Sequence, residues 1–165
     1  MNPTEQATHL PHRKFLERLL TLSEGRTKFR HKLTPSARDF IGISTGVSGL
    51  HFRYVIGLNE SRVELYIARP DATDNKRIFD ELESHRHEIE AAFEGLSSRE
   101  RLEDRKLSWE RLEGRKSSRI TCRLSNGGSE GDEARWETVQ HPMIDAMTRL
   151  EEALRPFISK LRTSS

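Results

Sequence analysis

Two neighbouring stretches of the chain alternate between apolar and polar residues, and this alternation constrains the fold more than any other feature. LHFRYVIGL, residues 50–58, alternates through its length, and RVELYIA, residues 62–68, repeats the pattern after a short turn. Side chains of a β-strand point alternately to its two faces, so the pattern is typical of a half-buried antiparallel hairpin. The apolar positions predict one buried face: Leu50, Phe52, Tyr54, Ile56, Leu58, Val63, Leu65 and Ile67.

Glu64 lies in the second stretch, on the face opposite that of the apolar side chains. One hypothesis makes it half of a metal-dependent nuclease site of the PD-(D/E)xK type, with Asp39 as the second carboxylate holding Mg²⁺. That motif requires a lysine two residues after the acid, and Tyr66 stands there instead. The alternation alone accounts for Glu64 as a solvent-facing strand residue, which is the interpretation we adopt.

Helical spacing of apolar residues appears on both sides of the hairpin. A first helix is expected to follow Pro11, and another to run from a cap at Thr73 or Asp74 to Gly95. The C-terminal segment is also helical in pattern. Proline lacks an N–H group and clashes with the preceding turn, so Pro142 is expected to break or restart this last helix.

Strand patterns recur at residues 39–44 and, as a second hairpin, at residues 107–124. The resulting order is α-β-β-β-α-β-β-α. It predicts an α+β fold with a five-stranded, mostly antiparallel sheet covered on one face by helices. We expect a single domain over residues 11–162, with an N-terminal tail at residues 1–10 and a C-terminal tail at residues 163–165.

Cysteine and histidine content argues against several kinds of chemistry. Cys122 is the only cysteine, so the chain forms no intrachain disulfide and a reducing cytoplasm is the simplest setting. His85 and His87 stand two apart on an expected helix and point away from each other. His12 and the other histidines are interpreted as surface residues. We therefore expect no catalytic residue, no metal site and no cofactor.

No apolar stretch approaches 18 residues, and the N-terminus lacks the pattern of a signal peptide, so no membrane association is expected. A charged stretch at residues 96–106 is interpreted as an exposed insertion.

Arginines gather on the outer strand faces, although the net charge of the chain is only +2. A basic sheet face that carries an aromatic residue can follow a phosphate backbone, and such binding is weak and indifferent to sequence. The alternative is an ordinary solvated face whose arginines pair with nearby acids. The predicted nucleic-acid-binding residues are Arg53, Tyr66, Arg111, Arg119 and Arg123.

Three stretches together resemble the bacterial domain of unknown function 4268 family: residues 46–93, residues 107–120 and residues 143–157. The resemblance implies the same order of elements, but the family has no established activity. Its members often form the C-terminal part of proteins whose N-terminal part looks like a PD-(D/E)xK nuclease. That association implies an accessory role near nucleic acid.

We therefore expect a non-catalytic binding or accessory module that acts with nucleic acid or with a nuclease-type partner protein. Two alternatives remain open. One is a divergent metal-dependent, nuclease-like enzyme, and the other is a protein–protein interaction module that does not bind nucleic acid.

Overall fold

The structure, a computed structural model, describes residues 3–24, 39–95 and 106–161. Its centre is a five-stranded sheet in the order β1-β2-β3-β5-β4, and every pairing is antiparallel. The strands are β1 Phe40–Ser44, β2 Leu50–Ile56, β3 Ser61–Ile67, β4 Ser108–Glu110 and β5 Ser118–Leu124. The helices are α1 Pro3–Ser23, α2 Ala72–Glu83, α3 Arg86–Gly95 and α4 Glu137–Ile158, with a short 3-10 helix, η2, at Glu133–Arg135. The α+β fold class is confirmed.

The strand register confirms which side chains share a face. Phe52, Leu65 and Ile120 stand side by side on β2, β3 and β5, and all three are fully buried. Leu58 was expected on the same buried face, but its exposed fraction is 52%. The alternation ends with β2 at Ile56, so Leu58 belongs to the turn and its side chain is not directed by the pleat.

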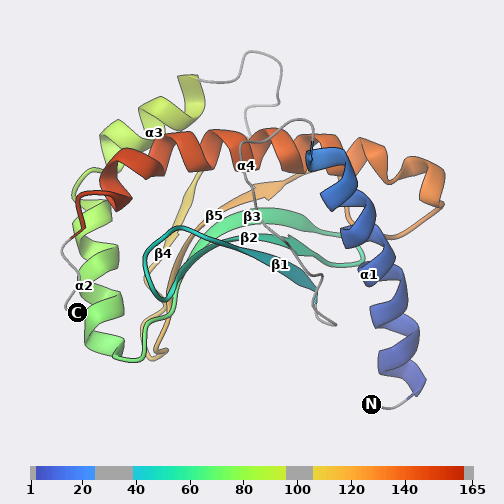
Figure 1. Cartoon of the computed structure of the whole chain (residues 1–165), viewed down its shortest axis with the longest axis horizontal. Coiled ribbons are helices and arrows are strands. Elements are labelled where there is room, and N and C mark those ends of the chain that lie inside the picture. The colour runs from blue at the N-terminus through green and yellow to red at the C-terminus, as the bar shows by residue number, and fades with distance from the viewer. Residues whose placement is uncertain (1–2, 25–38, 96–105, 162–165) are drawn as a thin grey trace.

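Helix α4 covers one face of the sheet (Figure 1). It packs on β2, β3 and β5, with α1 against it at one end and α3 against it at the other. Its side chains Met143, Met147, Leu150 and Leu154 are fully buried in the shared core. Figure 1 shows the opposite face of the sheet, toward the bottom of the view, lying between α1 and α2.

Pro11 and Pro142 lie inside helices, contrary to expectation. Helix α1 begins at Pro3 rather than after Pro11, and it runs through Pro11. Helix α4 continues through Pro142 without a break. A proline at position 142 leaves the carbonyl group of Thr138 without its usual helical donor, and the side-chain amide of Asn126 donates to that carbonyl at 3.1 Å. The loop before α4 therefore replaces the lost helical hydrogen bond.

The helical segment that follows the first hairpin is divided into α2 and α3, where one helix was expected. Its first turn is capped by Asp71, whose carboxylate accepts a hydrogen bond from the backbone N–H of Thr73 at 2.8 Å. Thr73 and Asp74 therefore lie within the helix rather than capping it. The apolar stripe continues across the division and is buried throughout: Ile78, Phe79, Leu82, Ile89 and Phe93.

Among the residues that the structure describes, no helix combines the length and the apolar character needed to cross a membrane. The expected C-terminal tail and nearly all of the expected insertion at residues 96–106 lie outside the described residues.

Candidate functional site

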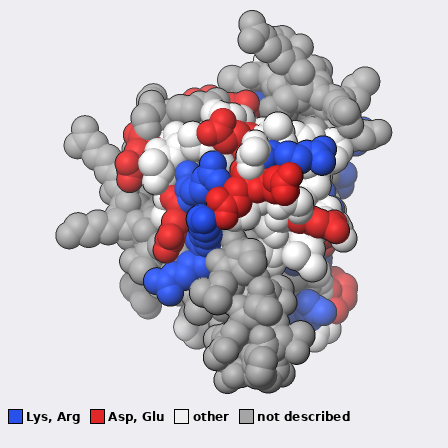
Figure 2. Space-filling model, turned by 90° about the vertical axis from the view of Figure 1, so that its right-hand side faces the viewer, with Lys and Arg blue, Asp and Glu red and all other residues white. Residues whose placement is uncertain are grey.

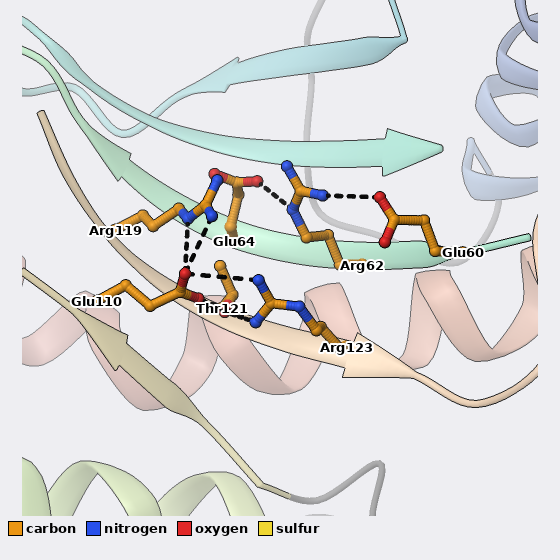
Figure 3. A network of polar contacts seen from close by, with 7 residues as sticks. All are labelled: Glu60, Arg62, Glu64, Glu110, Arg119, Thr121 and Arg123. Atoms are coloured by element: carbon orange, nitrogen blue, oxygen red, sulfur yellow. Dashed lines mark hydrogen bonds and ion pairs between the residues drawn. The ribbon is translucent and has the colours of Figure 1, made fainter. Parts of the chain in front are cut away.

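The face of the sheet that points away from α4 carries most of the charged strand residues, and we call it the open face. Figure 3 shows its charged side chains in front of the strands, with α4 behind them. Three rows of facing residues cross the sheet here, because each row joins directly opposed positions of antiparallel strands. The rows are Val55–Arg62–Arg123, Arg53–Glu64–Thr121–Ser108 and His51–Tyr66–Arg119–Glu110.

Glu64 lies on the open face, as the alternation predicted, but it is not solvent-facing. Its side chain is almost completely buried. One carboxylate oxygen, Oε1, accepts a hydrogen bond from Nε of Arg62 at 2.8 Å. The other, Oε2, is buried without a hydrogen-bond partner among the described residues. Alternation along a strand determines the direction of a side chain, whereas its burial depends on what surrounds it, which explains why the expectation was wrong.

Arg53, directly opposite Glu64, is held between two aromatic rings. The central carbon of its guanidinium group lies 3.8 Å from the centroid of the Phe40 ring and 4.3 Å from that of the Tyr66 ring. Both contacts are cation–π interactions, which are strongest where the cation has lost water. Burial lowers the pKa of Arg53 from its ordinary value, and the charge of Glu64 opposes this shift. The rings therefore fix Arg53 beside the buried carboxylate.

Glu110 organises the second half of the open face. Its carboxylate accepts hydrogen bonds from Arg119 at 3.0 and 3.1 Å, from Arg123 at 2.9 Å and from the Thr121 hydroxyl at 2.6 Å (Figure 3). Partial burial raises the pKa of Glu110, but the hydrogen bonds from Arg123, Thr121 and Arg119 outweigh it and lower the pKa to about 2. One carboxylate thus holds two arginines in place.

Cations remain in excess on the open face. Arg53, Arg62, Arg119 and Arg123 are accompanied by Glu64 and Glu110 within the rows. Glu60, at the start of the β3 hairpin, adds a third carboxylate 3.4 Å from Arg62. Four arginines therefore stand beside three carboxylates. The surplus of positive charge is small, and most of the guanidinium groups already have partners within the protein.

The structure brings together four of the five residues predicted to bind nucleic acid: Arg53, Tyr66, Arg119 and Arg123. Arg111 lies apart from them, because β4 ends at Glu110. Its guanidinium group pairs with Asp80 of α2 through two hydrogen bonds of 2.9 and 3.0 Å. It also pairs with Glu113.

Arg62 and Glu110 belong to the open face but were absent from the predicted set. The alternation along the chain already placed Arg62 on the same side as Glu64. The position of Glu110 depends on the pairing of β4 with β5, which no local pattern reveals.

The two carboxylates of the nuclease hypothesis do not meet. Asp39 lies next to α1, where its Oδ1 is 2.6 Å from Nδ1 of His12. Glu64 points from the middle of β3 to the open face. His12 was expected on the surface and is buried. Within residues 3–24, 39–95 and 106–161, no group of three or more His, Cys, Asp or Glu side chains is placed to hold a metal ion.

The side of the molecule formed by α1 carries interleaved charges rather than a basic patch (Figure 2). Lys14 and Arg18 both pair with Glu133, at 2.6 and 3.6 Å, and Arg13 pairs with Glu17 at 3.3 Å. Each of these basic side chains is therefore paired with a carboxylate on the same side of the molecule.

The fold and the open face define an α+β protein with one helix-covered and one charged sheet face. The chain belongs to the family described as Domain of unknown function (DUF4268), whose model matches residues 12–158. Comparison with curated proteins and with solved structures gives no match.

Proposed function

We propose that this protein is a non-catalytic binding or accessory module whose open face binds nucleic acid weakly and without sequence preference. The observation that supports this proposal is the small excess of arginines over carboxylates on the open face, where Arg53 lies between the aromatic rings of Phe40 and Tyr66. Arginines hold backbone phosphates, and aromatic rings stack on unpaired bases.

The internal ion pairs limit how strongly this face can bind. Arg62 and Arg119 are mostly buried and already bonded to Glu64 and Glu110. Arg123 is the most accessible of the four, with 49% of its side chain exposed. Phosphates compete with Glu110 for Arg123, so affinity is low. The slope of log affinity against log salt therefore corresponds to about one neutralised phosphate for each accessible arginine, and not to all four arginines of the open face.

The test is a fluorescence titration of labelled oligonucleotides at several salt concentrations. Arg123→Gln is expected to reduce the slope of log affinity against log salt by about 0.7 to 0.9. The matched control is Arg13→Gln, which removes the same charge from the α1 side, where Arg13 pairs with Glu17. Equal effects of the two substitutions would show that the binding depends only on the net charge of the protein and not on the open face. No binding at low salt, to single or double strands, would contradict the proposal and favour a protein–protein interaction module.

The accessory part of the proposal rests on the family. The family resemblance implies proteins in which this domain follows a PD-(D/E)xK nuclease-like N-terminal part, and this association favours a nuclease-type partner in a bacterial cytoplasm. Cys122 is buried, and a sequence with one cysteine forms no intrachain disulfide, which fits that compartment.

A further inference from the structure

A pocket of about 470 Å³ opens beside Tyr66, at one end of the open face. Its volume lies in the range of small-molecule sites. Two chain segments form it, one between β3 and α2 and one directly before β5. The lining residues are Tyr66, Ala68, Arg69, Pro70, Lys116 and Ser117. The pocket thus combines an aromatic ring, two cationic side chains and a hydroxyl group.

Asn75, fully buried in α2, ties the two walls of the pocket together. Its side-chain amide group donates to the backbone carbonyls of Arg69 and Lys116, at 3.0 Å each. Its Oδ1 accepts from the backbone N–H of Arg69 at 2.7 Å. A buried amide with three hydrogen bonds holds its partners in one arrangement. The spacing of the two basic residues is therefore set by the fold.

Lys76, the next residue of α2, fixes the turn between β4 and β5. Its ammonium nitrogen lies within hydrogen-bond distance of the backbone carbonyl oxygens of Leu112 and Ser117, at 3.0 and 2.7 Å, of that of Arg111, and of the Ser118 hydroxyl at 3.0 Å. The turn that carries Lys116 is thus anchored. A preorganised site loses less conformational entropy when a ligand binds.

The two cations of the pocket differ in mobility. Arg69 is mostly buried, with Nη1 donating to the Ser48 carbonyl at 2.8 Å and Nε lying 3.5 Å from Asp74. Lys116 is exposed on the rim. The pocket therefore offers one fixed guanidinium group, ion-paired with Asp74, and one ammonium group that can turn toward a bound anion.

We propose that this pocket binds a nucleotide, with its phosphate on Lys116 and Arg69 and its base against Tyr66 and Pro70. The inference rests on the proposed function, because the pocket continues the open face: Tyr66 stands opposite Arg119 and contacts Arg53. A single strand that ends in a phosphate and a free mononucleotide present the same chemistry.

Binding measurements with adenosine 5′-monophosphate, adenosine and inorganic phosphate test the ligand class. The nucleotide is expected to bind at least about tenfold more tightly than adenosine, since it adds charge-assisted hydrogen bonds. It is also expected to bind more tightly than inorganic phosphate, because only the nucleotide stacks on Tyr66. Equal affinity for the nucleotide and either smaller probe would overturn the proposal, as would no binding of the nucleotide.

Binding of a single-stranded oligonucleotide with and without a 5′-phosphate shows whether the ligand is a strand end or a free nucleotide. If the phosphorylated strand binds more tightly, the natural ligand of the pocket is the end of a strand. If the two strands bind equally and the mononucleotide binds tightly, the natural ligand is a free nucleotide. The same pair of strands separates this inference from the proposed function. If the open face does not bind nucleic acid, the unphosphorylated strand shows no affinity while the mononucleotide still binds.

Lys116→Gln is expected to lower nucleotide affinity about tenfold, through the loss of a charge-assisted contact. Arg115→Gln is the matched control, because Arg115 is exposed on the same turn but does not line the pocket. Tyr66→Leu is expected to lower the affinity for the nucleotide while leaving the affinity for inorganic phosphate unchanged. Equal losses in the Lys116 and Arg115 variants would contradict the assignment.

Discussion

Glu64 and Arg53 lie directly opposite each other on β3 and β2, and each retains a buried polar atom without a hydrogen-bond partner among the described residues. These atoms are Oε2 of Glu64 and Nε of Arg53. Burial of a charge is costly unless an opposite charge lies close by, so the two side chains compensate each other's burial. The open face therefore depends on its ion pairs for its own stability, whatever it binds.

Removal of the buried carboxylate is expected to destabilise the protein strongly. Glu64→Ala leaves Arg53 without its facing carboxylate and Arg62 with only the exposed Glu60, and should lower the free energy of unfolding by about 3–5 kcal/mol. Urea unfolding at neutral pH measures this loss. Glu60→Ala is the control, because Glu60 also pairs with Arg62 but is 65% exposed, and it should change stability by less than about 0.5 kcal/mol. Equal effects would show that burial of Glu64 contributes nothing.

Glu110 is expected to make stability depend on acid pH. Its pKa is about 2 in the folded protein, compared with an ordinary value of 4.5. The folded state therefore binds the proton less readily, so the stabilisation is complete above pH 4.5 and is lost as the pH falls toward 2. At neutral pH, Glu110→Gln should lower the free energy of unfolding by up to about 3 kcal/mol.

Unfolding curves of the wild type and the Glu110→Gln variant between pH 7 and pH 2 measure this dependence, and the two should converge at the acid end. Glu113→Gln, which removes an exposed partner of Arg111, should show no comparable convergence. A difference between wild type and Glu110→Gln that stays constant over this range would contradict the role of the ionised Glu110.

The core position of Leu65 predicts a large cavity effect. Leu65→Ala should lower the free energy of unfolding by about 2–5 kcal/mol, since the side chain is fully buried between the sheet and its helices. Leu58→Ala removes the same atoms from a side chain that is 52% exposed, and it should have a small effect. Thermal unfolding of both variants compares them. A small loss for Leu65→Ala would indicate a different strand register.

Asn75 is expected to support both stability and the pocket beside Tyr66. Asn75→Ala removes three hydrogen bonds to backbone groups of Arg69 and Lys116 and should cost roughly 3 kcal/mol, at about 1 kcal/mol per bond. Amide exchange at residues 116–118 should become faster, because the turn before β5 loses one of its two anchors and keeps only Lys76. Asn59→Ala, on the exposed turn between β2 and β3, is the control. Unchanged exchange at residues 116–118 would argue against the anchoring role.

The period-2 alternation of the sequence was sufficient to assign residues to the two faces of the sheet. It placed Leu65 in the core and put Arg53, Tyr66 and Glu64 on the opposite face, as the register confirms. This succeeded because the direction of a strand side chain follows from backbone geometry within a few residues. The same reasoning failed for Leu58, which lies where the strand has already ended.

Burial and pairing were decided by the tertiary structure. The hydrogen bonds from Arg119 and Arg123 to Glu110 exist only because β4 pairs with β5. The end of β4 at Glu110 likewise sends Arg111 to Asp80 of α2 instead of to the open face. Helix α4 passes through Pro142 because a loop residue, Asn126, supplies the missing donor. In each case the partner residue lies outside the local sequence pattern. The local sequence determined the direction of each side chain, whereas only the assembled sheet and helices determined which residues it contacts.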